Sequence, residues 1–397
     1  KTGLLVPPKD TEAMADAVIR LIRDKDLVSR LVEQANEKLK GNYTLAHMAE
    51  STLKVYEELR GSLNILVIKI GSIGDVILVT ASLKAIRKNF PHAKIHCLVG
   101  KESRRILYNC PYLDSVIVYD INGKDHGWIN LVKLSGKLRK YRFDKIIDLQ
   151  NNRKSHLLAF LSLPNKSYGY KNHKWGALLT DGIKDTRKDI PPVDHQFQVL
   201  DSVGVQSKGS PCLELWPTPQ DKAYAQSLLD SEWLGNNLNI VGINIAASAK
   251  WQTKNWPIGH IAELCDQLSA KNIRAAITGM DKDRPLAKYL LSIAKSKPAN
   301  FVGKTDILQL VALIKRCKVF ITSDSAPLHI AAAMQVPVLA LFGPTDSRRH
   351  IPPAKKIVVF EKQLACAPCY SSKCRIFTHA CMKEIRPQDV LKQVEGL

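Results

Sequence analysis

Apolar positions in residues 63–397 form short runs typical of buried strands, separated by longer amphipathic stretches typical of helices. This alternation predicts a doubly wound α/β arrangement with a parallel sheet in each half of the region. Ligands of such sheets bind beyond the carboxyl ends of the strands. The predicted strands are 64–70, 94–100, 115–120, 145–150, 239–246, 273–279 and 318–323, and the predicted helices are 75–90, 259–271 and 307–317.

The stretch 321–345 has the pattern of a strand, a helix start and a second strand. Small polar residues end the first strand, and Pro327 suits an early helical position. Backbone N–H groups at Ser325 and Ala326 would then favour an anion such as a diphosphate. An ordinary capped helix in an α/β core fits the same spacing, and His329 alone is typical of a packed core histidine.

A second turn between strand and helix contains Gly71, Gly74 and Asp75. Asp75 would stand at the helix start, where a carboxylate is favoured, and a plain helix cap explains it equally well. The pattern is not G-x-G-x-x-G, and the phosphate-loop pattern G-x-x-x-x-G-K-[ST] is missing. Simple dehydrogenase and ATPase functions are therefore disfavoured.

Charge is distributed unevenly along the 397 residues. The net formal charge is +21, made up of 0 in residues 1–61, +11 in 62–215 and +10 in 216–397, and this change predicts a domain boundary near residue 61. The basic part indicates an acidic partner, which could be nucleic acid, anionic lipid or phosphorylated glycan. No apolar run reaches the length of a membrane span, and the nine cysteines do not resemble a secreted disulfide framework. A cytoplasmic protein with reduced thiols is expected.

Three segments, taken in order, carry a family resemblance: 69–95, 253–264 and 321–346. Together they resemble the family 9 glycosyltransferases, which are ADP-heptose:lipopolysaccharide heptosyltransferases. The resemblance covers about 62–397 and implies a GT-B fold of two facing Rossmann-like domains. It implies an acceptor domain at 62–215, a nucleotide-sugar domain at 216–397, and no cofactor.

The resemblance also assigns roles to individual residues. Asp75 matches the aspartate proposed as the base that takes the acceptor hydroxyl proton, and Lys254 matches the lysine that contacts donor phosphate. Asp324 matches the aspartate that holds donor sugar hydroxyls, and Ser325 and Ala326 match the turn that faces the phosphates. His329 and Thr345 also occupy motif positions on the donor side.

The implied function is metal-independent, inverting transfer of heptose from ADP-heptose to the lipopolysaccharide inner core. It places the protein peripherally on the cytosolic face of the inner membrane. Ser72, Arg104 and Arg105 are acceptor-side candidates, and basic clusters in the first domain could receive an anionic glycolipid. Another nucleotide sugar or glycan acceptor is an alternative within the family. A nucleic-acid-binding protein is an alternative outside it, although zinc-finger, RNP and helix-turn-helix signatures are missing.

Two further motifs raise the question of a metal. Asp281 and Asp283 form a D-x-D string, which is expected to lie in a solvated loop. The cysteines Cys366, Cys369, Cys374 and Cys381 could form a structural cluster, although zinc ligands usually come in two separated pairs. Reduced thiols packed in a loop are the favoured interpretation, and no catalytic metal is expected.

Residues 1–60 show a different pattern of amphipathic helices. They resemble the C-terminal tail of family 4 glycosyltransferases, without the catalytic body of such an enzyme. This resemblance predicts a helical segment fused to an upstream transferase. A helical extension without a function of its own is the alternative.

Overall fold

The computed structural model of this chain describes residues 2–59, 63–185, 190–206, 211–234 and 239–397. The chain divides into two compact units, residues 1–62 and 63–397. The predicted boundary between residues 61 and 62 lies outside the described residues. None of the helices in the described ranges is both long and apolar enough to traverse a lipid bilayer.

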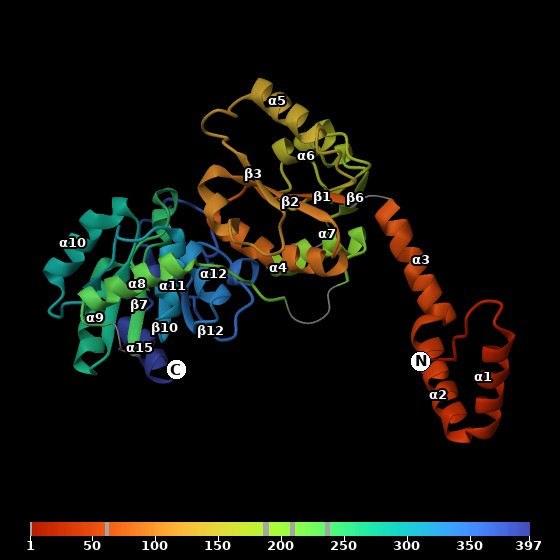
Figure 1. Ribbon diagram of the computed structural model, residues 1–397. Coiled ribbons are helices and arrows are strands. Elements are labelled where there is room, and N and C mark those ends of the chain that lie inside the picture. The colour runs from red at the N-terminus through yellow and green to blue at the C-terminus, as the bar shows by residue number, and fades with distance from the viewer. Residues whose placement is uncertain (1, 60–62, 186–189, 207–210, 235–238) are drawn as a thin grey trace. The chain divides into compact units, whose positions relative to one another are not determined.

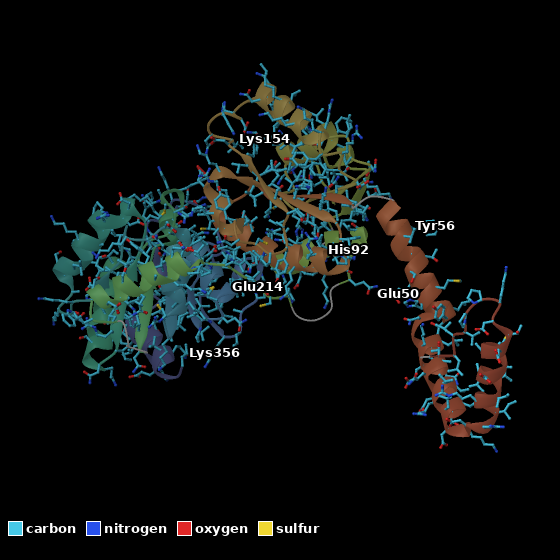
Figure 2. The ribbon with its side chains drawn as sticks, viewed as in Figure 1. Glu50, Tyr56, His92, Lys154, Glu214 and Lys356 are labelled. Carbon is cyan, nitrogen blue, oxygen red and sulfur yellow. The ribbon has the colours of Figure 1, made fainter. Side chains whose placement is uncertain are left out.

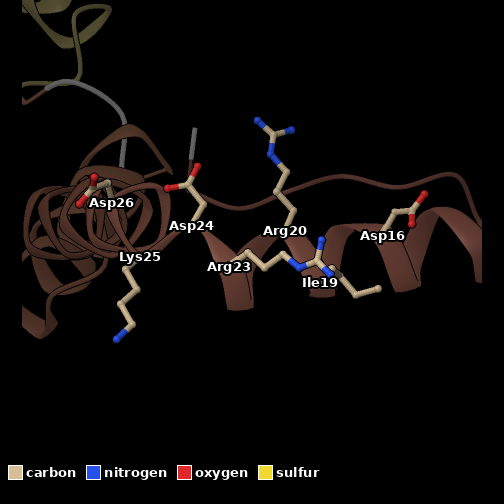
Figure 3. Close-up of a pocket in the computed structure, with 7 residues that line it drawn as sticks. All are labelled: Asp16, Ile19, Arg20, Arg23, Asp24, Lys25 and Asp26. Carbon is tan, nitrogen blue, oxygen red and sulfur yellow. The ribbon is translucent and has the colours of Figure 1, made fainter.

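The first unit consists of three helices: α1 (Thr11–Arg23), α2 (Lys25–Asn42) and α3 (Leu45–Leu59). Asp10 and Asp24 cap the starts of α1 and α2 by accepting backbone N–H groups. Neither α1 nor α2 has a buried residue, and their apolar side chains are half-buried or exposed. A hollow at the turn between them is surrounded by charged side chains that point in different directions (Figure 3), which gives no sign of a binding site.

The second unit contains two six-stranded parallel sheets (Figure 1), and this confirms the predicted fold class. The first sheet has the order β3-β2-β1-β4-β5-β6 and the second the order β12-β11-β10-β7-β8-β9. The first contains β1 (Asn64–Ile68), β2 (Lys94–Gly100), β3 (Ser115–Tyr119), β4 (Lys145–Asp148), β5 (Lys166–Lys171) and β6 (Asp181–Lys184). The second contains β7 (Ile240–Asn244), β8 (Arg274–Thr278), β9 (Ala299–Asn300), β10 (Val319–Ser323), β11 (Val338–Leu341) and β12 (Ile357–Phe360).

Helices cover both sheets, as parallel strands buried on both faces require. The first sheet is accompanied by α4 (Ile73–Asn89), α5 (Trp128–Arg139), α6 (Arg153–Leu161), α7 (Pro192–Val203) and the short 3-10 helices η1 (Lys101–Leu107) and η2 (Gly176–Leu178). The second is accompanied by α8 (Pro219–Ser231), η3 (Ala249–Lys254), α9 (Ile258–Ala270), η4 (Asp281–Asp283), α10 (Arg284–Ile293), α11 (Ile307–Lys315), α12 (Ala326–Ala333), α13 (Ser347–His350), α14 (Ala380–Lys383) and α15 (Pro387–Glu395).

The two halves of this unit share an apolar core through α4 and α12. Val76 and Ile77 of α4 belong to the same buried cluster as Leu328 and Ala331 of α12. The connecting segment adds polar contacts, because Glu214 (labelled in Figure 2) accepts hydrogen bonds from Lys84 at 2.5 Å and Tyr112 at 2.5 Å. The packing of α4 against α12, rather than these polar contacts, brings the starts of the two helices to the same region of the molecule.

Candidate functional site

The turn after β1 holds Asp75 in the first turn of α4. Ser72 caps this helix, and its Oγ lies 3.0 Å from Asp75 Oδ2. Lys69 Nζ lies 3.4 Å from Asp75 Oδ1. Burial works to raise the pKa of Asp75, but the positive charge of Lys69 and the hydrogen bond from Ser72 outweigh it, so the pKa lies below its usual value. With its side chain 44% exposed, Asp75 is an accessible carboxylate at neutral pH.

Lys69 is a site residue that sequence analysis did not single out. It is 8% exposed, at the end of the otherwise apolar β1 run, and its Nζ donates to the Leu149 carbonyl at 3.1 Å. The same loop supplies Gln150, whose Oε1 accepts from the Gly71 N–H at 2.7 Å. The sequence does contain one indication of Lys69, namely a charged residue that interrupts an apolar strand. A buried charge requires a partner, so such a residue is a candidate for a specific site.

A buried pair beneath this loop fixes its course. Asp148 Oδ1 accepts the N–H groups of Gln150 and Asn151, at 2.8 and 3.1 Å. Its Oδ2 lies 3.5 Å from His156 Nε2, and both side chains are fully buried. Burial raises the pKa of Asp148. The pair therefore holds the loop that in turn positions Lys69 and Gly71.

In the second half, Asp324 follows β10 and accepts hydrogen bonds from two side chains. Lys254 Nζ, at the end of η3, lies 2.7 Å from Asp324 Oδ2, and Thr345 Oγ1 donates to the same oxygen at 2.8 Å. Burial works to raise the pKa of Asp324, but Lys254, His350 and Thr345 bring it below its usual value. Oδ1 has no hydrogen-bond partner among the described residues, so this oxygen is free to accept a hydrogen bond.

The start of α12 leaves its backbone N–H groups without a side-chain cap. Ser325 precedes the helix, but its Oγ turns back toward Thr322 Oγ1 at 3.1 Å and the Ser323 carbonyl at 3.2 Å. Ser325 and Ala326 are half-buried. Such a helix start is suited to an anion, because free N–H groups and the helix dipole both favour negative charge.

His329 connects the two halves. A Cβ placed on Gly74 of α4 would lie 2.7 Å from His329 Cδ2, so only a glycine admits this close approach. Burial lowers the pKa of His329 to about 4 despite the nearby carboxylates of Asp324 and Asp75, which leaves the ring neutral at pH 7. Its Nδ1 is buried with no hydrogen-bond partner among described residues. The predicted base and the predicted donor residues thus belong to one region.

The acceptor-side candidates differ in their surroundings. Ser72 borders a small cavity of about 130 Å³ whose lining includes Lys101 and Asp120. Arg104 is exposed and forms no hydrogen bond or ion pair with described residues. Arg105 instead reaches the second half, where its guanidinium lies 2.8 Å from Asp306. Contact of these three residues with an acceptor remains a prediction.

The two candidate metal motifs lie in different surroundings. All nine cysteines are free thiols, including Cys366, Cys369, Cys374 and Cys381. Among residues whose placement is described, no group of three or more His, Cys, Asp or Glu side chains is arranged to hold a metal ion. The D-x-D string lies in η4, where Asp281 pairs with Arg284 at 2.5 Å and is 80% exposed.

Comparison with known proteins decides the family. Residues 131–379 match the sequence profile described as glycosyltransferase family 9 (heptosyltransferase). The chain belongs to glycosyltransferase family 9. The match covers more than half of the chain and includes Lys254, Asp324 and His329. It begins after Asp75 and after residues 1–60, so the family 4 resemblance of that segment stays a prediction.

Individual relatives and solved structures are similar to most of this chain. Lipopolysaccharide heptosyltransferase 2 of Salmonella typhimurium is 27% identical over 84% of this chain and 98% of its own length. A family 9 glycosyltransferase from Veillonella parvula has a TM-score of 0.78 with 23% identity, covering 85% of this chain and 97% of that one. ADP-heptose lps heptosyltransferase II of E. coli has a TM-score of 0.69 with 23% identity, covering 84% and 98%. The two structures confirm the fold of two Rossmann-like domains.

Proposed function

We propose that this chain transfers heptose from ADP-heptose to the inner core of lipopolysaccharide. Family 9 membership and the similarity to lipopolysaccharide heptosyltransferase 2 support this function. One observation carries the proposal: Gly74 packs against His329, which brings the Asp75 carboxylate and the uncapped start of α12 to one junction. A base and a diphosphate site are the two parts that glycosyl transfer needs.

Asp75 acts as the general base in this proposal. Its lowered pKa keeps it ionised at neutral pH, and its partial exposure leaves it within reach of an acceptor hydroxyl. The acceptor oxygen attacks C1 of the heptose as its proton passes to Asp75, and the bond from C1 to the diphosphate oxygen breaks. Attack opposite the leaving group inverts the anomeric centre. General-base help of this kind is worth about 10² to 10⁴ in rate.

The second half holds the donor and stabilises the departing ADP. The N–H groups at Ser325 and Ala326 face one side of the diphosphate, and Lys254 supplies a positive charge. Asp324 Oδ1 accepts a hydrogen bond from a sugar hydroxyl, while Oδ2 remains bound to Lys254 and Thr345. Fixed positive groups thereby do what a divalent cation does in other transferases, and this supports transfer without a metal ion.

His329 contributes as a neutral group. Lys69 already places one positive charge beside Asp75, and a cationic imidazole would add a second and weaken the carboxylate further as a base. The pKa of about 4 avoids this at neutral pH, because burial disfavours the charged ring. The buried, unpartnered Nδ1 is a polar atom that a bound donor could satisfy.

The proposal extends to location and to residues 1–60. A lipopolysaccharide precursor is anchored in the inner membrane, so the chain would act peripherally on its cytoplasmic face. Residues 1–60 would be the tail of an upstream transferase. Exposed apolar side chains such as Ile22 (72%) and Leu45 (81%) support this, because they would be covered by the rest of such an enzyme.

Product mass is the direct test. The protein is incubated with ADP-heptose and a panel of truncated lipopolysaccharides, and the products are weighed by mass spectrometry. We expect one acceptor to gain a single heptose, which also identifies the truncation that exposes the accepting hydroxyl. Transfer only from another nucleotide sugar would leave the fold assignment intact but contradict the donor. Failure with every acceptor, using protein that binds ADP, would contradict the proposed acceptor.

A further inference from the structure

Four large apolar side chains are exposed at one edge of the first half. Trp128, Ile129 and Val132 lie in the first turns of α5 and are 55%, 74% and 54% exposed. Trp175, just before η2, is 43% exposed, and its ring centroid lies 6.0 Å from that of Trp128. These four side chains are called the α5 patch below.

The helical period explains why part of α5 must point outward. Leu131, Leu134 and Leu138 form its buried face. Ile129 and Val132 therefore lie outside that face, where a helix of a globular protein usually carries polar residues. An apolar surface opposite the core face has no role in the packing of the described residues. Contiguous exposed apolar surface of this kind is typical of an interaction site.

Basic residues surround the α5 patch. Residues 123–142 contain six Lys or Arg and residues 151–175 contain five, whereas Asp125 is the one acidic residue in both segments. Asp125 is buried and accepts the Asp120 N–H at 2.8 Å, so it does not offset the charge at the surface. The exposed or half-exposed basic side chains include Lys124, Lys133, Lys137, Lys154 (labelled in Figure 2), Lys171 and Lys174.

The position of the α5 patch relates it to the candidate site. Trp128 follows β3 and Trp175 follows β5, and both strands run parallel to β1, which leads to Asp75. Carboxyl ends of parallel strands lie at the same edge of a sheet, so the patch and the base share that edge. A surface held against the α5 patch would therefore be on the acceptor side of the molecule.

We propose that the α5 patch docks on a lipid bilayer containing anionic lipid, with its aromatic and aliphatic side chains in the interface. This rests on the proposed function in one respect, since the acceptor would be anchored in that bilayer. Tryptophan favours the membrane interface, and lysines around it are attracted to an anionic leaflet. A second copy of the chain is disfavoured because two equally basic faces would repel. Nucleic acid would use the lysines but leaves Ile129 and Val132 without a role.

Vesicle flotation tests this proposal with the full chain. Wild-type protein is mixed with vesicles of phosphatidylethanolamine and phosphatidylglycerol, or of phosphatidylcholine alone, without donor or lipopolysaccharide. We expect binding to the anionic vesicles only, weakening from about 0.1 M to about 1 M salt as the Debye length falls. Trp128→Ala should lower the partition coefficient about tenfold, as loss of a buried large apolar group predicts.

Two matched variants keep the result specific. Trp233→Ala removes a tryptophan that is 95% exposed in the second half, and binding should stay within about twofold of wild type. Ile129→Asn removes a different apolar side chain of the α5 patch and leaves the contact between Trp128 and Trp175 intact. It should also weaken binding to the anionic vesicles. Equal binding by wild type and both α5 variants would overturn the proposal. So would binding of single-stranded RNA that the α5 variants weaken while vesicle binding is unchanged.

Transfer assays separate this inference from the proposed function. With a delipidated, water-soluble core acceptor, Trp128→Ala should match wild type in kcat, because the α5 patch does not contact the reacting groups. With the acceptor embedded in vesicles, the same variant should be about tenfold slower at low acceptor density. Wild type that binds vesicles but transfers to neither acceptor would contradict the proposed function and leave the docking surface in place.

Discussion

The contact between Gly74 and His329 makes a sharp prediction about Gly74→Ala. Gly74 stands in the first turn of α4 with a helical backbone, where alanine is ordinarily better than glycine by about 0.5 to 1 kcal/mol. The added Cβ would lie 2.7 Å from Cδ2 and 3.1 Å from Nε2 of His329. Both distances are shorter than an ordinary contact, so one helix has to shift.

The magnitude follows from setting these two effects against each other. His329 is 8% exposed in a helix packed on all sides, so its ring has little room to retreat. Inserting a methyl group into such packing costs about 1 to 3 kcal/mol. We therefore expect a net destabilisation of about 1 kcal/mol. A displacement approaching 1 Å between base and donor would lower kcat by up to about a hundredfold.

Unfolding and kinetic assays measure the two consequences. The urea midpoint reports the stability change, and hydrogen exchange of α4 and α12 amides locates it. Gly136→Ala is the matched control, because Gly136 is also helical, in α5, and its Cβ would meet nothing within 4 Å. That variant should gain about 0.5 to 1 kcal/mol and keep its activity. If Gly74→Ala behaved in the same way, the α4–α12 contact would not exist as described.

Four further predictions concern the site chemistry. Asp75→Asn should lower kcat by about 10² to 10⁴ while ADP affinity persists, because a base acts on the chemical step; turnover near wild type would remove Asp75 from the mechanism. Since the pKa of Asp75 is lowered, the base form persists as pH falls, and the midpoint of the acid limb of kcat/KM should lie below the pKa of an ordinary aspartate. Lys69→Gln should move the midpoint of this limb to higher pH, because it removes the positive charge that lowers the pKa of Asp75. An unchanged midpoint would show that Lys69 does not affect the base. Transfer should continue in excess EDTA, whereas magnesium-reversible loss would restore Asp281 as a ligand. Calorimetry should give tighter binding of ADP than of UDP or GDP and weaker binding of all three in Lys254→Ala; a preference for UDP would contradict the ADP donor.

The sequence predicted the buried strands well because their apolar runs are continuous. β2 was expected at 94–100 and occurs there, and β10 starts one residue later than expected and ends at Ser323 as expected. The strands it missed lie toward sheet edges: β5 and β6 in the first sheet, and β9 and β12 in the second. β5 is KSYGYK, with charged ends and a central glycine, and β9 has only two residues. Such segments lack the apolar signal on which the prediction depended.

Site residues that lie within a recognisable motif could be predicted from the sequence. Their contacts with residues far away in the sequence could not. The turns containing Asp75 and Asp324 follow strands, so their location at the sheet edge could be inferred. The pairing of Lys69 with the Leu149 carbonyl, 80 residues away, could not. Arg105 was predicted as an acceptor-side residue, and nothing in the sequence indicated that it binds Asp306, 201 residues away. The pairing of β1 with β4 brings Lys69 to Leu149, and the packing of η1 against α11 brings Arg105 to Asp306.

The placement of site residues at strand ends has an evolutionary consequence. Asp75 and Lys69 belong to segments that follow a strand of the first half, and Asp324, Lys254 and Thr345 to segments that follow strands of the second. Under the proposed function, mutations in the first set of segments would change the acceptor, and mutations in the second set would change the donor. Neither set of mutations would alter the strands of the two sheets. Specificity for the two substrates can therefore diverge separately within one lineage, while the junction of Gly74 and His329 constrains both halves together.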